Sequence, residues 1–186
     1  IGFCLVGSEM CIRDRGNAHY GATQVVITAG GFTKKENYQF IADLGHSIIA
    51  PNPSLFTFNL PNASILALQG LVTNAEVKIK NTSFVESGPL LITHWGMSGP
   101  AILKLSAWGA RELHATNYEF DYTVNWLPEH SVNSVEEYLI GQKNEFGAKQ
   151  IGNAFNVDIP KKLKAHLLEK AGIRFDSKWA ETSNPV

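Results

Sequence analysis

The sequence contains few cysteines, and both of them, Cys4 and Cys11, lie within residues 1–16. A disulfide framework or a thiolate metal site therefore has no support in the rest of the chain. The histidines show no spacing typical of zinc ligands, so we expect no metal site. Because low cysteine content suits a reducing compartment, we expect a cytoplasmic location.

Long apolar runs and an excess of one charge sign are also missing. No stretch approaches the ~20 apolar residues that span a bilayer, and the net charge of the 186 residues is −1. We therefore expect neither a membrane nor a nucleic-acid partner. The short basic cluster Lys161, Lys162 and Lys164 is interpreted as a solvated face. With 44% apolar residues, the chain can form a core in one ordinary domain or two small ones.

The N-terminal segment is treated separately because Val6–Arg15 has no clear strand or helix period. The peptide Glu9–Arg15 can be encoded by DNA that resembles the transposon end of a sequencing adapter. We interpret residues 1–16 as a translated adapter scar, which is excluded from fold reasoning. The alternative is a genuine loop. Since the chain begins with Ile, we expect an internal fragment of a longer protein.

Residues 17–51 have the pattern of half a β-α-β unit. The β-branched run Gln24–Thr28, which ends at two glycines, predicts a buried parallel strand and a tight turn. The spacing over Lys34–Leu44 predicts a helix that stops at Gly45. The prolines in Pro51–Pro53 mark a loop and a domain boundary.

Beyond that loop, the apolar residues alternate. The segments Phe56–Leu60, Ala75–Lys80 and Tyr118–Trp126 predict half-buried antiparallel strands. With a buried strand at Leu90–Ile92, they predict a small barrel or sandwich over residues 52–128.

After Pro128 the period becomes helical, which predicts a helical subdomain over residues 129–186. Ser134–Glu137 fits a capping box. A second helix is predicted to open at Asp158–Pro160 and to end at Gly172, with Leu163, Leu167 and Ala171 on one face.

The stretch Gly88–Ala110 combines a strand, a polar turn and a helix. Ser98 is a suitable N-cap, and proline is tolerated in a first helical turn, where Pro100 falls. The helix that follows has only Lys104 and Ser106 as polar residues, so we expect it to be buried.

Several interpretations of this turn stay open. Gly96–Pro100 resembles the G-x-S-x-G elbow of serine hydrolases, but Pro100 stands where the elbow has glycine, which makes a Ser98 nucleophile less favoured. A helix start also offers N–H groups to an anion or carbonyl, near Ser98 and Gly99. Thr93 and His94 would add side-chain donors, although a lone histidine is more often a core residue.

The turn Thr28–Gly31 is a second candidate site. Ligands bind beyond the carboxyl ends of strands in open α/β sheets, and Gly30 and Gly31 let a ligand approach the backbone. A plain tight turn explains the same residues.

Three ordered segments carry a family resemblance. Val25–Gly31 is similar to a strand ending in Ala-Thr-Gly-Gly, and Leu44–Leu55 is similar to a Leu-Gly-His and Pro-Ser-Leu run. Leu91–Ser106 is similar to a Phe-Thr-His-x-Gly-x-Ser-Gly-Pro-Ala motif. Together they resemble the YhiN-like NAD(P)/FAD-dependent oxidoreductases, which include aminoacetone oxidase and bile-acid dehydro-reductase types.

The resemblance implies an α+β chain. Residues 17–51 would be a remnant strand and helix of a Rossmann-like FAD domain, residues 52–128 a β-barrel-like insert, and residues 129–186 a helical subdomain. The parent would be an FAD-dependent enzyme, with NAD(P)H as a candidate electron donor and a small molecule as substrate. The flavin contacts carried over are Thr28, Ala29, Gly30 and Gly31, while Thr93, His94, Gly96, Ser98 and Gly99 would face the flavin and substrate cleft.

The sequence also departs from the family pattern. The G-x-G-x-x-G fingerprint and a C-terminal FAD segment are absent, and Thr28-Ala29 stands where the family has Ala-Thr. We therefore expect this fragment alone to bind no FAD and to be inactive. The resemblance assigns no catalytic residue, and the alternative function is a non-catalytic module that binds a small ligand or peptide near Ser98.

Overall fold

The computed structural model describes residues 3–15, 18–154 and 157–182. The chain divides into two compact units, Ile1–Pro51 and Asn52–Val186. Within the described residues, every helix is too short or too polar to cross a membrane.

The first unit consists of a hairpin and a short helical segment. Strand β1 (Phe3–Arg15) pairs antiparallel with β2 (Ala18–Ile27), followed by η1 (Lys35–Tyr38) and α1 (Gln39–Ala42). The predicted helix is confirmed in two pieces, and Gly45 follows it with a left-handed φ of 88°.

The prediction of a buried parallel strand at Gln24–Thr28 is wrong. Its residues up to Ile27 lie in β2, whose partner β1 is antiparallel, and the side chain of Val26 is 47% exposed. A buried parallel strand needs parallel neighbours and cover on both faces, and the described residues supply only one antiparallel neighbour. Val6–Arg15, which shows no period in the sequence, lies in β1. Residues 1, 2 and 16 of the suspected adapter scar lie outside the described residues, and that interpretation stays a prediction.

The second unit contains a curled sheet of five antiparallel strands, which confirms the mixed α/β fold with a half-barrel. The strands lie in the order β3-β6-β5-β4-β7. Their bounds are Phe58–Asn59 for β3, Val72–Ile79 for β4, Val85–Ile92 for β5, Gly96–Ser98 for β6 and Tyr122–Asn125 for β7. A 3₁₀ turn, η2 (Ser64–Leu68), precedes β4.

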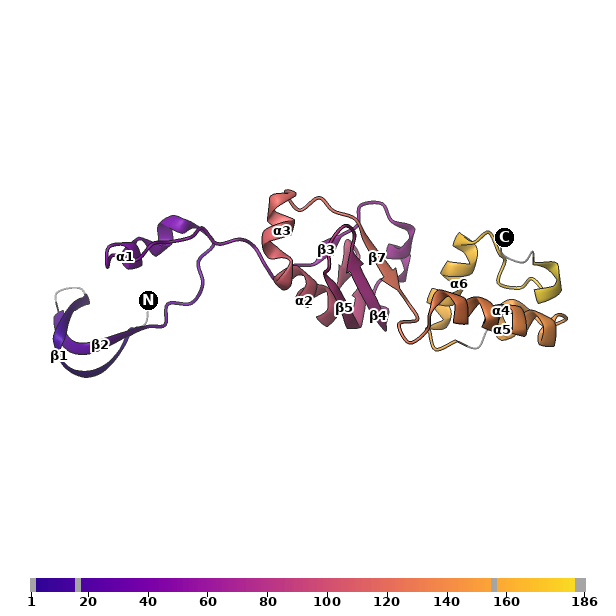
Figure 1. The fold of residues 1–186 in the computed structure, drawn as a ribbon, viewed down its shortest axis with the longest axis horizontal. Coiled ribbons are helices and arrows are strands. Elements are labelled where there is room, and N and C mark those ends of the chain that lie inside the picture. The colour runs from indigo at the N-terminus through magenta and orange to yellow at the C-terminus, as the bar shows by residue number, and fades with distance from the viewer. Residues whose placement is uncertain (1–2, 16–17, 155–156, 183–186) are drawn as a thin grey trace. The chain divides into compact units, whose positions relative to one another are not determined.

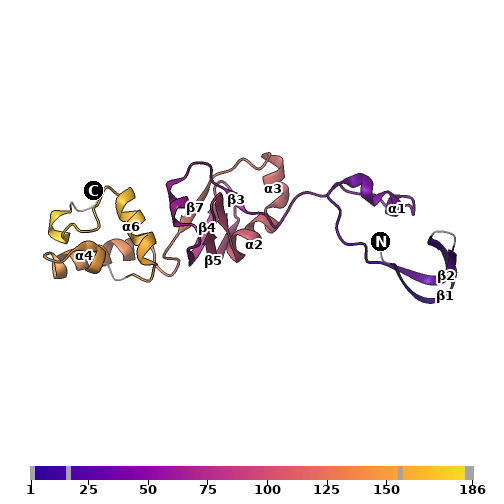
Figure 2. The same ribbon diagram turned by 180° about the vertical axis from the view of Figure 1, so that it is seen from behind.

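The alternation of the sequence decides which face of this sheet is buried. Val77 and Ile79 of β4 and Leu90 and Ile92 of β5 are at most 1% exposed. Helix α2 (Pro100–Trp108) lies against the sheet, as Figures 1 and 2 show from opposite sides. Its buried apolar residues join the sheet residues in one core.

Helix α2 differs from its prediction in two ways. It is one-sided rather than buried all round, because Lys104 is exposed and the Trp108 side chain is 70% exposed. Its N-cap is Gly99, with a φ of 99°, whereas Ser98 lies in β6. The predicted place of Pro100 in the first turn is confirmed.

The polar side chain of Ser106 is fully buried because α2 uses it to hold a distant segment. Its hydroxyl donates to the Leu103 carbonyl at 2.9 Å and accepts from the Phe56 N–H at 3.0 Å. A buried hydroxyl that both donates and accepts a hydrogen bond loses little free energy relative to the same hydroxyl in water. This bond attaches the segment before β3 to the helix.

Strand β7 is shorter than the alternation predicts, because a helix occupies the chain before it. Helix α3 (Ala110–Ala115) is followed by Asn117 and Tyr118, both with left-handed φ values. The Tyr118 N–H donates to the Leu113 carbonyl at 2.8 Å, which closes the helix end. The chain therefore becomes extended only at Tyr122.

The C-terminal part is helical, as predicted. It contains α4 (Val132–Phe146), α5 (Ile151–Ala154), α6 (Lys161–Lys170) and η3 (Trp179–Glu181). The cap of α4 is Ser131, whose hydroxyl accepts from the Ser134 N–H at 3.1 Å, so the prediction of Ser134 as the cap is wrong.

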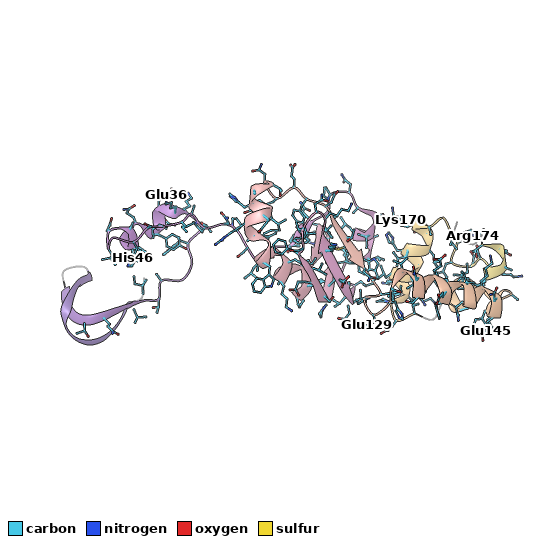
Figure 3. All side chains as sticks on the ribbon, viewed as in Figure 1. Glu36, His46, Glu129, Glu145, Lys170 and Arg174 are labelled. Carbon is cyan, nitrogen blue, oxygen red and sulfur yellow. The ribbon has the colours of Figure 1, made fainter. Side chains whose placement is uncertain are left out.

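Helix α6 follows Pro160, its Leu163 is fully buried, and Gly172 follows it with a φ of 72°. Figure 3 marks Lys170 in α6 and Arg174 beyond it.

Substitution by alanine at two glycines of the second unit is expected to have opposite effects on stability. A Cβ at Gly96 would lie 1.9 Å from the Phe58 carbonyl oxygen, whereas a Cβ at Gly141 of α4 meets nothing within 4 Å. Gly96→Ala is therefore expected to destabilise the fold by about 3 kcal/mol. Gly141→Ala is expected to stabilise it by about 0.5–1 kcal/mol. Urea unfolding of both variants measures the difference, and equal midpoints would contradict the close approach at Gly96.

Candidate functional site

The turn between β5 and β6 is held by its own polar groups. The Thr93 hydroxyl donates to the Gly96 carbonyl at 3.0 Å and accepts from the Gly96 N–H at 3.1 Å. The Thr93 N–H also donates to the Gly96 carbonyl, and the Leu60 N–H donates to the Trp95 carbonyl, both at 2.8 Å. The turn is therefore fixed in shape and attached to the segment after β3.

This fixed turn presents two rings to solvent. His94 is exposed, the Trp95 side chain is 52% exposed, and their ring centroids lie 4.1 Å apart. Thr93 is half-buried and Gly96 is buried. Of the predicted residues on this turn, only His94 offers its side chain freely to a substrate.

The geometry at Ser98 does not support a serine hydrolase. Ser98 pairs with Leu91 in the ladder between β6 and β5, and it is half-buried. Among the described residues, its hydroxyl makes no hydrogen bond to a histidine or a carboxylate. A nucleophilic serine needs such a base within hydrogen-bond reach.

The helix start beside Ser98 is also a poor anion site. Gly99 is the N-cap and Pro100, the first helical residue, has no N–H to offer. A Cβ at Gly99 would lie 2.7 Å from the Pro89 carbonyl oxygen, so β5 packs directly against this position. The small-ligand or peptide module centred on Ser98 therefore has no support from the geometry.

The second predicted site, Thr28–Gly31, lies in the first unit directly after β2. Thr28, Gly30 and Gly31 are exposed, Ala29 is half-buried, and Gly30 has a left-handed φ of 71°. Nothing lies within 4 Å of a Cβ placed at either glycine, so the turn is open to a ligand but forms no wall. The described residues of this unit do not by themselves fit FAD.

The half-barrel closes at a seam where its edge strands meet through aromatic rings. Phe58 of β3 lies 4.9 Å from Phe120 and 5.1 Å from Tyr122 of β7, measured between ring centroids. Phe56 meets Tyr118 edge to face at 5.4 Å. Among the described residues, β3 and β7 share no hydrogen-bonded ladder. Within the described part of the chain, ring packing therefore takes the place of a backbone ladder between these two edges.

A cavity of about 340 Å³ opens at this seam, and we call it the seam cavity. Its walls carry five aromatic rings, those of Phe56, Phe58, Tyr118, Phe120 and Tyr122. Pro53, Thr57 and Asn59 complete its lining, and none of the lining side chains is charged.

The hydroxyls of Tyr118 and Tyr122 are buried and have no hydrogen-bond partner among the described residues. Burial raises the pKa of the Tyr122 phenol above its ordinary value. An unpartnered buried hydroxyl costs about 1–3 kcal/mol. Native folds hold few such groups, and both tyrosines line the seam cavity, which makes it a candidate ligand site.

The sequence pattern does not predict this cavity. The alternation placed all five of its aromatic residues on strand faces, but a period of two says only which side chains share a face. The sequence pattern does not show that β3 and β7, the first and last strands in the order of the sheet, come together. The stretch Tyr118–Tyr122, with three aromatic residues in five positions, is the one signal that could have suggested it.

A larger cavity of about 650 Å³ lies in the helical part and is lined mostly by apolar side chains. Its polar groups include Lys143, whose ammonium donates to the Thr182 carbonyl at 2.6 Å. Walls of this kind offer little to orient a polar substrate. Within the described residues, no three His, Cys, Asp or Glu side chains gather as a metal site would require.

The turn at Thr93 gives a prediction about stability. Thr93→Val removes both hydrogen bonds of the hydroxyl while keeping the side-chain shape, and is expected to cost about 1–2 kcal/mol. Thr123→Val, at an exposed position of β7, is the matched control and should change stability by less than about 0.5 kcal/mol. Urea unfolding of the three proteins checks this. An equal effect of both substitutions would show that the turn does not depend on Thr93.

The buried phenol of Tyr122 gives a prediction about alkaline pH. Its pKa is raised in the folded state, and the pKa of a free tyrosine is about 10. The unfolded chain therefore loses this proton first, so stability is full below about pH 10 and falls as the pH rises beyond it. From about pH 8 to about pH 11, the chain should lose about 1 kcal/mol more than Tyr122→Phe in urea unfolding. Parallel losses would contradict burial of the phenol.

Comparison with known proteins identifies the family to which this domain belongs. Residues 52–186 match the family described as the HI0933-like protein barrel and H2TH domain. The ribosomal RNA dihydrouridine synthase of Escherichia coli (strain K12) is 27% identical over 159 residues, which cover 79% of this chain and 36% of that protein. The chain thus spans well under half the length of this curated relative. HI0933-like proteins belong to the FAD-dependent oxidoreductases, which are enzymes. The chain therefore belongs to the HI0933-like family, and its residues 52–186 are the barrel and H2TH domain.

Proposed function

We propose that this chain is part of an FAD-dependent oxidoreductase that reduces uridine in ribosomal RNA, in which the barrel and helical parts bind the substrate. The observation that carries the proposal is the family match over residues 52–186. The name of the E. coli relative supplies the substrate class. The finer resemblance to aminoacetone oxidase and bile-acid dehydro-reductase types is not needed for it.

The chemistry of the reaction divides the work between parts of the protein. Conversion of uridine to dihydrouridine adds two hydrogens across the C5–C6 bond of the base, so a two-electron donor is required. The open turn at Thr28–Gly31 does not enclose a flavin. We therefore assign no redox step to the described residues. Their contribution is to bind the RNA, to hold the base and to exclude water from it.

RNA as substrate replaces the expectation of no nucleic-acid partner. That expectation rested on a net charge of −1 for the whole chain, which excludes a uniformly basic surface but says nothing about a local one. Helix α6 begins with the exposed Lys161 and Lys162 and has no acidic residue in its first turn. Desolvation, and then the charge of Lys161, lowers the pKa of Lys164. Such a locally positive segment suits contact with phosphate.

Two measurements test the proposed function. The protein encoded by the complete reading frame should be yellow, with a flavin absorbance spectrum. With NAD(P)H as electron donor, it should introduce dihydrouridine into ribosomal RNA that lacks the modification, as detected by mass spectrometry of nucleosides. The 186-residue chain alone should be colourless and inactive, which makes it the control. A colourless complete protein that FAD does not reconstitute would refute the proposal, and a flavoprotein without RNA product would refute its substrate.

A further inference from the structure

We propose that the seam cavity is the site that holds a pyrimidine base, the uracil of the substrate RNA, after that base leaves its stack. This inference rests on the proposed function and names the place where its substrate binds. Enzymes that act on a base within RNA or DNA must first extrude it into a pocket, because stacking hides the reacting atoms.

The walls of the seam cavity suit a flat ring. The half-buried rings of Phe56, Tyr118, Phe120 and Tyr122 come from both sides of the seam, so a base in the cavity can contact rings from the two edges of the half-barrel. Stacking of a base on an aromatic side chain contributes about 1–3 kcal/mol. Rings already packed against each other lose little further freedom when a ligand enters.

The size and charge of the seam cavity narrow the choice of ligand. No charged side chain lines it, so it favours a neutral group over a phosphate or a nicotinamide cation. Its volume of about 340 Å³ is near the lower end of the ~300–1,000 Å³ range of small-molecule pockets. A single base with part of its ribose fits this range better than a dinucleotide.

Polar groups in the lining match the edge of a pyrimidine. The Asn59 side chain carries a carbonyl acceptor and an amide donor, which complement the N3–H and the adjacent carbonyl of uracil. The hydroxyls of Tyr118 and Tyr122 lack partners. A small shift of either side chain that brings its hydroxyl to a uracil carbonyl would recover part of the cost of burial.

The imide edge of uracil also occurs in the isoalloxazine ring of flavins. The experiment therefore distinguishes a uracil base from a flavin as the ligand. Binding of fluorescein-labelled octauridylate to the 186-residue chain is measured by anisotropy, with riboflavin as competitor. An eight-unit abasic ribose-phosphate oligomer reports contacts to the RNA backbone alone. We expect octauridylate to bind at least tenfold more tightly than the abasic oligomer and riboflavin not to displace it.

Variants locate the site. Asn59→Leu should weaken octauridylate binding about tenfold, which corresponds to about 1.4 kcal/mol. Asn74→Leu, at an exposed position of β4 outside the seam cavity, is the matched control and should change binding less than twofold. Tyr122→Phe keeps the ring, is not expected to lower stability at neutral pH, and should weaken binding at least threefold. It therefore tests the site even if Asn59→Leu folds poorly.

Several results would overturn the inference. These are equal affinities of the Asn59 and Asn74 variants, equal binding of the abasic oligomer, or displacement of octauridylate by riboflavin. If the complete protein makes dihydrouridine while Asn59→Leu and Tyr122→Phe leave its KM for RNA unchanged, the inference is wrong and the proposed function stands. If these variants weaken octauridylate binding but the complete protein carries no flavin, the inference stands and the proposed function is wrong.

Discussion

The second unit depends on one close approach of backbone, that of β3 to β6 at Gly96. With the Phe58 carbonyl occupying the place where a Cβ would stand, only glycine fits. The Thr93 turn places Gly96 at this position, and the hydrogen bond that the Phe56 N–H donates to the Ser106 hydroxyl brings in the chain before β3. The aromatic seam follows from these contacts, because they place Phe58 where it meets Phe120 and Tyr122.

The parts of this fold that sequence could predict are those governed by a short period. Alternation identified the buried face of β4, a short apolar run identified the end of β5, and the helical period identified α4 and α6, because burial acts on neighbouring residues in the same element. The caps were less predictable. Ser98 and Ser134 both follow the preference for serine at a helix start, but the chain uses Gly99 and Ser131. In α2, strand pairing of Ser98 with Leu91 outweighed the local preference.

Prediction of the site was limited for a similar reason. The residues predicted to face a cleft, from Thr93 to Gly99, lie on one turn and the short strand after it, but most of them serve to fix the sheet. The seam cavity depends on Phe56 and Phe58 meeting Tyr118, Phe120 and Tyr122 across some sixty residues of sequence. Such a meeting is decided by tertiary packing, on which a local pattern carries no information.

The lengths of the edge strands have a consequence for how this protein behaves at high concentration. A half-barrel leaves two rows of backbone donors and acceptors that can recruit strands from other molecules, which is a common route to aggregation. Here β3 has two residues and β7 has four, so neither edge offers a long row. The exposed Lys80 and Asp121 form an ion pair of 3.5 Å beside β7. Short edges and surface charge thus leave a second copy of the chain little backbone to pair with, although among the described residues aromatic rings, and no backbone ladder, join the two edges at the seam.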